Sequence, residues 1–429
     1  MDSRYHRSNA LLTRALSTIP LASQTFSKSI VQYPRGVSPL FLTRGKGCRV
    51  WDADGHEYID FVSGLLSLTL GYGDPDVDAA VRRQLDSGVI FSLPHPLEME
   101  VAERLTQMVP CAEMVRFGKN GSDATAGAVR LARAYTGRDH VAVCGYHGWQ
   151  DWYIGSTSRN LGVPKATQAL THPFVYNNPG SLQQLLAAHP GEVAAVILEP
   201  TNVTAPTPGF LEQVKELTHA AGAVLIFDET ITGFRFANGG AQELYGVVPD
   251  LATLGKGLAN GYPLSAVVGR REIMQHMEEI FFSFTFGGET LSLAAAAAVL
   301  DKLRREPVVA TLWEKGRRLQ TAVRAAIARH NVGHFLSLAG QPVWSLLLVA
   351  DQPSCTQWEI KSLFMQELFS RGILAFGSHN LNYAHGDAEL NRLVQVYDEV
   401  FPILKRAVDE GEMANLLRCE PIQPVFRVR

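Results

Sequence analysis

Four short apolar runs in the middle of the chain predict buried β-strands. They lie at residues 141–144, 193–198, 223–227 and 264–268. The runs are continuous rather than alternating, as expected for strands that are covered on both faces. Between them, segments 181–189 and 210–221 carry apolar residues at helical spacing, the second opened by Pro208-Gly209 and closed by Gly222. This alternation predicts an α/β protein with a mostly parallel sheet and helices on both faces.

The flanking sequence predicts a smaller α+β domain. Residues 49–61 have the pattern of a hairpin with Asp54-Gly55 as its turn. Further along, residues 300–330, 358–371 and 390–410 are expected to be helical, and 343–350 to form a strand. We therefore predict an amino-terminal segment of the small domain at 1–65, a large domain at 66–305 and a carboxyl-terminal small domain at 306–429.

The first thirty residues contain arginines, many serines and one acid, a composition that raises the question of a transit peptide. The spacing of Leu11, Leu12, Leu16 and Ile19 fits an amphipathic helix packed on the body of the protein better. No apolar run has the length needed to cross a bilayer.

Composition narrows the classes of partner. The 429 residues are 46% hydrophobic and 19% charged, as in an ordinary globular enzyme. A net charge of -3 with dispersed signs gives no basic face, which disfavours nucleic acid and anionic membranes as partners. Five cysteines lie far apart without Cys-x-x-Cys spacing, which predicts free thiols in a reducing cytoplasm and no metal site. They are Cys48, Cys111, Cys144, Cys355 and Cys419.

Polar residues gather where the predicted strands end. Tyr146 follows the first strand, Glu199 follows the second and Asp228 follows the third. Ligands of parallel sheets collect beyond the carboxyl ends of the strands. A single acid at such a place is commonly a helix cap or the partner of an arginine, but three strand ends together favour a binding site.

Lys256 adds a nucleophile to this group. It follows an apolar segment and stands between two glycines, and an amine withdrawn from water has a lowered pKa. A Gly-Lys-Gly segment alone is more often a solvated turn. Together with Asp228, however, Lys256 matches the needs of a pyridine cofactor that carries an aldehyde. The lysine forms the Schiff base, and the acid keeps the ring nitrogen protonated.

Two segments are candidates for binding a phosphate. Gly121 and Ser122 precede a helical pattern at 125–135, so their amides and hydroxyl would lie at a helix amino terminus. The alternative is an ordinary helix cap. Thr285, in a loop of small residues before an alanine-rich helix, is a second hydroxyl. The glycine patterns of nucleoside triphosphate and dinucleotide sites are missing, which disfavours a nicotinamide oxidoreductase.

The ordered set of motifs resembles the class III pyridoxal-phosphate aminotransferases. Within that family it is most similar to the glutamate-1-semialdehyde 2,1-aminomutase branch, from about Val37 onward. The motifs are Asn120–Ala124, Arg130–Arg133, Tyr146–Gly148, Glu199-Pro200, Asp228–Arg235, Pro249-Asp250 before Lys256, and Thr285–Gly288. The resemblance implies pyridoxal-phosphate fold type I, pyridoxal 5'-phosphate as cofactor, and a homodimer with shared active sites.

The resemblance also implies roles for single residues. The cofactor-binding set would be Gly121, Ser122, Tyr146, Glu199, Asp228, Thr230, Lys256 and Thr285. Lys256 and Asp228 would be catalytic, and Tyr146 would stack on the ring. Gly121 and Ser122 would hold the phosphate together with Thr285 of the partner subunit, and Glu199 would support the O3′ side. Thr230 stands where the family usually has valine, so its hydroxyl needs a partner.

Three departures favour an aminotransferase over an aminomutase. The insertion with a carboxylate-binding arginine is missing from 35–44, Gly64-Leu65 replaces a serine-tryptophan pair, and the segment at 149–159 is short for a gating loop. Weaker retention of the intermediate favours release of the new carbonyl product. We therefore expect ping-pong transfer between an amine or amino-acid donor and a keto or aldehyde acceptor. Intramolecular transfer by an aminomutase is the alternative, and a catalytically silent scaffold is disfavoured because the lysine and the acid are both present.

Substrate contacts are predicted from Leu65, Trp149 and Arg159. Arg159 and Arg235 are both candidates for a substrate carboxylate, and both could equally form structural ion pairs, which is the role we favour for Arg235. Trp149, Trp152 and Tyr153 would either line a pocket for a bulky substrate or pack on the surface.

Overall fold

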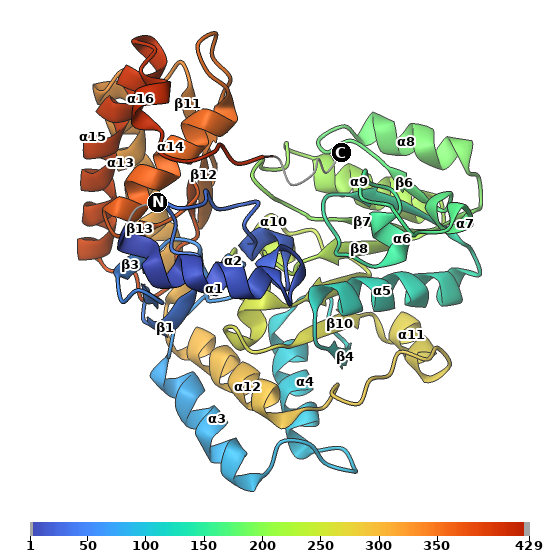
Figure 1. The fold of residues 1–429 in the computed structure, drawn as a ribbon. Helices are drawn as coiled ribbons and strands as arrows, with labels where there is room; N and C mark the ends of the chain where they lie inside the picture. Colours follow the sequence, from blue (N-terminus) through green and yellow to red (C-terminus); the bar gives the residue numbers. More distant parts are fainter. Residues whose placement is uncertain (1–2, 424–429) are drawn as a thin grey trace. The chain divides into compact units, whose positions relative to one another are not determined.

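A seven-stranded β-sheet forms the centre of residues 75–309 (Figure 1). In spatial order its strands are β4 (Met114–Gly118), β10 (Ser265–Gly269), β9 (Leu251–Leu254), β8 (Val224–Asp228), β7 (Val193–Leu198), β5 (His140–Cys144) and β6 (Thr171–Pro173). All neighbouring pairs from β9 to β6 are parallel, and β10 runs antiparallel to both β9 and β4. The predicted mostly parallel sheet is confirmed, but the predicted strand at 264–268 is the antiparallel member.

Helices cover both faces of this sheet. Helix α5 (Gly121–Thr136) packs on one face, against residues such as Val143, Ile197 and Ile226. Helices α8 (Pro179–Ala188) and α9 (Phe210–Ala220) pack on the other, where the alternate residues of the same strands point. Since both faces are buried, every position of these strands has to be apolar, which explains the continuous runs in the sequence.

Helix α5 begins shortly after the carboxyl end of β4, and its cap residue precedes the Gly121-Ser122 pair. Asn120 is the N-cap residue, and its backbone N–H donates to Asp123 Oδ2 at 2.7 Å. Ser122 is therefore not the cap, and its hydroxyl lies within the first turn. The helix ends at Gly137, whose φ of 68° is left-handed.

The chain forms two units, of which the second runs from Pro75 to Val309 and the first takes the chain through Asp74 and again from Ala310. The computed structural model describes residues 3–423. The other helices of the second unit are α3 (Pro75–Ser87), α4 (Pro96–Met108), α6 (Asp151–Ile154), α7 (Lys165–Gln168), α10 (Ala241–Tyr245), α11 (Arg271–Met274) and α12 (Thr290–Arg305), with the 3-10 turns η4 (Lys256–Ala259) and η5 (Gln275–Glu278).

The first unit holds two small sheets. One has the order β1 (Leu42–Lys46), β2 (Arg49–Asp52), β3 (Glu57–Asp60), β13 (Ile373–Leu374), and the other the order β11 (Leu336–Gln341), β12 (Trp344–Val349), β14 (Ser378–His379). Its helices are α1 (His6–Leu16), α2 (Ser63–Leu66), α13 (Val308–Arg329), α14 (Gln357–Ser370), α15 (Asp387–Asp409) and α16 (Met413–Leu416), with the turns η1 (Ser3–Tyr5), η2 (Pro20–Ala22) and η3 (Phe26–Lys28).

The amino-terminal helix packs on the predicted hairpin. Strands β2 and β3 pair in antiparallel register, and Asp54 in their turn accepts hydrogen bonds from Arg7 N at 2.6 Å and Ser8 N at 3.0 Å. Among residues 3–423, no helix combines the length and apolar character that crossing a bilayer would require.

The single helix predicted at residues 300–330 is two helices in the structure. Residues 300–330 belong to the end of α12 and to α13, which are separated at Pro307. Proline has no backbone N–H and disfavours helical geometry in the residue before it, so the helix is interrupted there.

Candidate active site

Asp228, the last residue of β8, is the most firmly held side chain of the site. His147 Nδ1 lies 2.9 Å from Asp228 Oδ2, while Thr253 Oγ1 and Thr230 N donate to Oδ1 at 3.0 and 3.1 Å. His147 Nε2 lies 3.2 Å from the carbonyl oxygen of Cys144. A carboxylate and a carbonyl are both acceptors, so each ring nitrogen of His147 faces an acceptor in this arrangement.

These contacts keep Asp228 charged although it is buried. Burial acts to raise the pKa of the carboxyl, but the hydrogen bond and charge of His147, with the contacts of Thr230, outweigh it. The pKa of Asp228 consequently lies below its ordinary value. An ionised carboxylate in a dry site is able to stabilise a protonated ring nitrogen of a ligand.

Lys256 follows β9 as the first residue of η4. Its φ of 41° is left-handed, which is uncommon for a residue with a side chain. Burial lowers the pKa of its amine, and the carboxylates of Asp228 and Glu199 only partly oppose that effect. The neutral, nucleophilic form of Lys256 is therefore easier to reach than that of a solvated lysine.

Glu199 and Tyr146 lie together beyond β7 and β5. Glu199 Oε2 accepts a hydrogen bond from Tyr146 N at 3.1 Å. Burial and the nearby Asp228 raise the pKa of Glu199. Gly145 has a φ of 107°, and a Cβ atom there would lie 2.5 Å from Glu199 Oε2, so only glycine permits this approach. Tyr146 is 46% exposed, and its ring packs in a T-shaped arrangement with the ring of Tyr153 at a centroid distance of 5.7 Å.

The start of α5 forms a narrow cradle against Thr230. A Cβ atom at Gly121 would lie 2.9 Å from Thr230 Cγ2. Ser122 Oγ accepts a hydrogen bond from Trp149 N at 3.3 Å. Within residues 3–423, Thr230 Oγ1 is buried and has no hydrogen-bond partner. Backbone amides of a helix start and a hydroxyl thus converge beside an unpaired buried hydroxyl, an arrangement suited to an anion.

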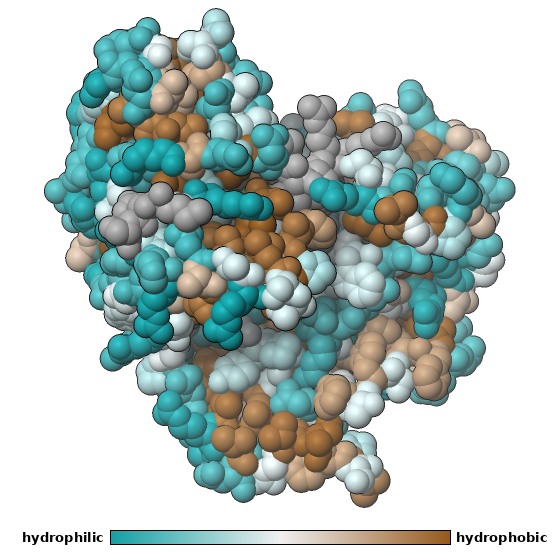
Figure 2. Space-filling view, viewed as in Figure 1, coloured by the Kyte–Doolittle hydropathy of each residue, from teal (hydrophilic) through white to brown (hydrophobic). Residues whose placement is uncertain are grey.

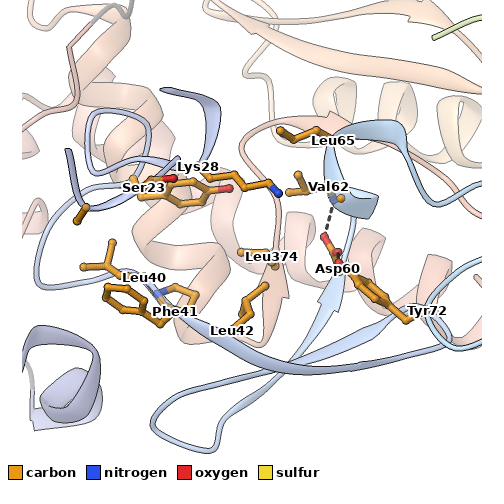
Figure 3. A pocket seen from close by; sticks show the side chains of 14 residues that line it. Ser23, Lys28, Leu40, Phe41, Leu42, Asp60, Val62, Leu65, Tyr72 and Leu374 are labelled. Carbon is orange, nitrogen blue, oxygen red and sulfur yellow. Dashed lines mark hydrogen bonds between the residues drawn. The ribbon is translucent and has the colours of Figure 1, made fainter. Parts of the chain in front are cut away.

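The structure brings together Gly121, Ser122, Tyr146, Glu199, Asp228, Thr230 and Lys256. Thr285 lies in an exposed segment of the same chain. Trp149 is 65% exposed, and Arg159 is exposed. Leu65 belongs to the first unit, where it lines a pocket of about 370 Å³ together with Lys28 and Asp60 (Figure 3).

Two of the predicted entrance aromatics are core residues. Trp152 and Tyr153 are buried against the sheet, and Tyr153 OH donates to the carbonyl oxygen of Gly145 at 2.8 Å. The expectation that they pack on the surface is wrong, because α6 turns them inward. Arg235 is fully buried, and burial lowers the pKa of its guanidinium to about 10.

Sequence reasoning gave no role to two contacts of Asp228. His147 was visible only as the neighbour of Tyr146 at a strand end, and that position was the available signal. Thr253 lies in the apolar segment before Lys256, which was not recognised as a strand. In β9 it is the register partner of Asp228, which places its hydroxyl beside the carboxylate.

Comparison with known proteins decides the family. The class III aminotransferase family matches residues 32–375. This chain belongs to that family. As a class III aminotransferase it is a pyridoxal-phosphate enzyme of fold type I, and the prediction of family, fold, cofactor and aminotransferase activity is confirmed.

The relatives of this aminotransferase include proteins named as aminomutases and proteins named as aminotransferases. It is 36% identical to the glutamate-1-semialdehyde 2,1-aminomutase of Symbiobacterium thermophilum, over 94% of this chain and 99% of the relative. It is 33% identical to the 3-aminobutyryl-CoA aminotransferase of Cloacimonas acidaminovorans, over 92% and 98%. Among solved structures, the PLP-bound FumI protein of Sphingopyxis sp. MTA144 matches with a TM-score of 0.87 at 28% identity, over 97% of this chain and 98% of that one.

Proposed function

We propose that this enzyme transfers an amino group between two separate small molecules, an amine or amino-acid donor and a keto or aldehyde acceptor, in a ping-pong cycle. The observation that carries the proposal is the placement of Lys256, with a lowered amine pKa, beside the ionised Asp228 that His147 holds. A nucleophilic amine and a fixed counter-charge for a ring nitrogen are the two groups this chemistry requires.

The residues of the site fit pyridoxal 5'-phosphate. Gly121 and Ser122 would hold the phosphate at the start of α5, where a side chain on Gly121 would close the cradle. Asp228 would face the ring nitrogen, Tyr146 would cover the ring, and Glu199 would lie on the O3′ side. The cofactor supplies an aldehyde and a ring that accepts electrons.

Lys256 would act twice. It would hold the cofactor in the resting enzyme, and when its amine is free it would carry the proton at the substrate Cα. The lowered pKa suits this task, because a proton carrier has to be neutral in part of each cycle.

Substrate contacts are proposed from Trp149, Arg159 and Leu65. Trp149 follows the segment that contains Tyr146 and His147. Its backbone N–H donates to Ser122 Oγ, so this exposed residue lies at the edge of the proposed phosphate site. Arg159 offers an exposed cation for a carboxylate. Leu65 gives the pocket of the first unit an apolar wall.

A homodimer with shared active sites is also proposed. Exposed apolar side chains gather on the second unit around α3 and α4 (Figure 2): Leu85, Ile90, Phe91, Leu93 and Met99. A patch of this kind is typical of a surface covered by another protein. Thr285 of the partner subunit would then reach the phosphate. A cytoplasmic location is supported by five cysteines without disulfides, four of them buried.

A donor and acceptor panel tests the activity. The purified enzyme is mixed with pairs of substrates, each pair consisting of one amine and one keto acid. Two quantities are followed: the loss of the absorbance band of the resting cofactor, and the transfer of the amino group to the keto acid. We expect net transfer only when both substrates are present. Isomerisation of a single amino aldehyde without a second substrate would favour the aminomutase, a function that the relative from Symbiobacterium thermophilum keeps open. Borohydride should fix the cofactor at Lys256, and a label elsewhere would refute the assignment.

A further inference from the structure

Three histidines meet at the outer edge of the central sheet, away from the candidate active site. His140 is the first residue of β5, His172 lies in the edge strand β6, and His189 follows α8. One ring nitrogen from each lies within 4.8 Å of the others. His140 opens β5 whereas Tyr146 and His147 follow its end, so the cluster lies at the opposite ends of the strands from Lys256.

The contacts within the cluster are close. His140 Nδ1 lies 2.8 Å from His172 Nε2, and the two rings are parallel within 3° at a centroid distance of 5.0 Å. The centroids of His172 and His189 are 4.3 Å apart. Glu192 adds a carboxylate, with Oε2 3.1 Å from His189 Nδ1 and 3.9 Å from His140 Nε2.

We propose that His140, His172, His189 and Glu192 bind a divalent transition-metal ion of the zinc type. Imidazole nitrogens and a carboxylate oxygen are ligands of Zn²⁺, and four of them complete its tetrahedral shell. Metal–ligand bonds of about 2.0–2.2 Å would require the ring of His140 or His172 to turn, because their facing nitrogens share a hydrogen bond in this structure. The four residues come from two strands and a turn, and His140 and His172 are 32 residues apart in the sequence. Their spacing therefore does not match a metal-binding sequence motif.

Four protein ligands leave no open position on the ion, so this site would be structural. It would join β5, the edge strand β6 and the turn between α8 and β7. We expect the ion to stabilise the second unit and to leave the amino-transfer chemistry unchanged, because Lys256 and Asp228 belong to the other end of the sheet.

The test uses the cofactor-loaded enzyme after treatment with a chelator and its removal. Titration with Zn²⁺ in a calorimeter should give one ion per chain with a dissociation constant of about a micromolar or tighter, and saturating Zn²⁺ should raise the melting temperature by a few degrees. Co²⁺ in place of Zn²⁺ should give the visible absorption of a tetrahedral site. His172→Ala and, separately, His189→Ala should weaken binding by at least about a hundredfold, since each removes a ligand.

His334→Ala is the matched control, because His334 pairs with Asp409 in the first unit and lies outside the cluster. It should bind Zn²⁺ like the wild type. Cofactor absorbance of each variant confirms that it is folded. The absence of saturable Zn²⁺ binding to the wild type, or equal binding to folded His189→Ala, would overturn the proposal.

Discussion

Asp228 receives hydrogen bonds from His147, Thr253 and Thr230, one on Oδ2 and two on Oδ1. The acid of this pair is thus fixed in position and kept ionised, whereas the amine of Lys256 is made easier to deprotonate. The pKa values of both buried groups are lowered, Asp228 by its hydrogen-bonded neighbours and Lys256 by burial, and such perturbed values are typical of a catalytic site.

Asp228→Asn keeps the shape of the side chain and removes its charge. We expect kcat/KM to fall by about 10²–10³-fold, because the charge that stabilises the reacting ring is lost. The cofactor should remain bound through the phosphate contacts, which an absorbance spectrum checks. Unchanged turnover in a cofactor-loaded variant would contradict the role of Asp228.

The same substitution should also change the pH dependence of Lys256. The Asp228 carboxylate raises the pKa of the lysine, so its removal should lower that pKa further below the ordinary value of about 10.4. The rate at which the apoenzyme captures pyridoxal phosphate should rise with pH through a midpoint that lies lower in Asp228→Asn than in the wild type. Asp86→Asn, on the exposed side of α3, should leave the midpoint unchanged, and a shift to higher pH in Asp228→Asn would refute the coupling.

Thr230 is a second test at the scale of one residue. Its buried hydroxyl makes no hydrogen bond of good geometry among residues 3–423, so Thr230→Val should leave the free energy of unfolding of the apoenzyme within about 1 kcal/mol of the wild type. The control is Thr232→Val, which removes a hydroxyl bonded to Glu229 and should cost about 1–3 kcal/mol. Urea titrations measure both. A large loss of kcat/KM in Thr230→Val would instead show that its hydroxyl serves the cofactor or the substrate.

At the scale of the element, α1 receives its cap from another part of the chain. Tyr5 holds the N-cap position but makes no capping bond with its side chain, and Asp54 in the hairpin turn bonds Arg7 N and Ser8 N instead. The bonds from Ser8 and Arg7 outweigh partial burial and lower the pKa of Asp54. The stabilisation it gives is therefore present above an ordinary aspartate pKa of about 3.9 and is lost as the pH falls through the lowered value.

Asp54→Asn replaces one of the two accepting oxygens by an N–H donor, so it should destabilise the start of α1 by about 1 kcal/mol at pH 7. Hydrogen exchange of the Arg7 and Ser8 amides should then be about fivefold faster than in the wild type. At pH values below the pKa of the folded carboxyl the two proteins should exchange at similar rates. An equal difference at both pH values would show that the charge of Asp54 has no part in capping.

The sequence predicted those elements whose burial imposes a pattern. Continuous apolar runs revealed β5, β7 and β8 because both faces of these strands are covered. The three-residue strand β6 was missed because it is too short for a period to show, and β9 because Thr253 and the nearby glycine interrupt its apolar character. Pairing partners are set by tertiary contacts, so the antiparallel direction of β10 had no local signal.

The residues of the candidate site also fall into those that the sequence predicts and those that it does not. Lys256, Asp228 and the start of α5 could be predicted because each stands at a fixed place relative to a strand or helix end. His147 and the histidine cluster could not, because their partners come from strands that are neighbours only in the folded sheet. Chemistry that depends on cross-strand register is invisible until the order of the strands is known.

At the scale of the whole molecule, the proposed dimer predicts a dependence on the α3–α4 surface. Leu93, which is 79% exposed, would be covered by a partner, so Leu93→Glu should shift the protein from dimer to monomer in sedimentation experiments. Leu161, which is fully exposed elsewhere on the second unit, provides the control. Leu161→Glu should sediment like the wild type, and a wild-type monomer would refute the dimer.

Shared active sites make a further prediction for mixed subunits. Lys256→Ala removes the nucleophile, and Thr285→Ala would weaken the phosphate contact in the neighbouring site. A mixed dimer should contain one intact site, so random exchange of equal amounts should restore about a quarter of the wild-type sites. Retention of cofactor by the mixture, beyond the sum of the two parents, measures this. No recovery after demonstrated exchange would place Thr285 outside the partner's site.

Because β10 runs antiparallel to β9, the connection between these two strands tolerates less change in length than the loops elsewhere in the sheet. Lys256 lies in the reversal between β9 and β10, where both ends are clamped in neighbouring strands, so an insertion there would displace the amine. The segment that leaves β7 leads instead into α9 through residues 199–209, which accept changes in length beyond Glu199. New substrates can thus be acquired by changes in that loop while Lys256 keeps its position.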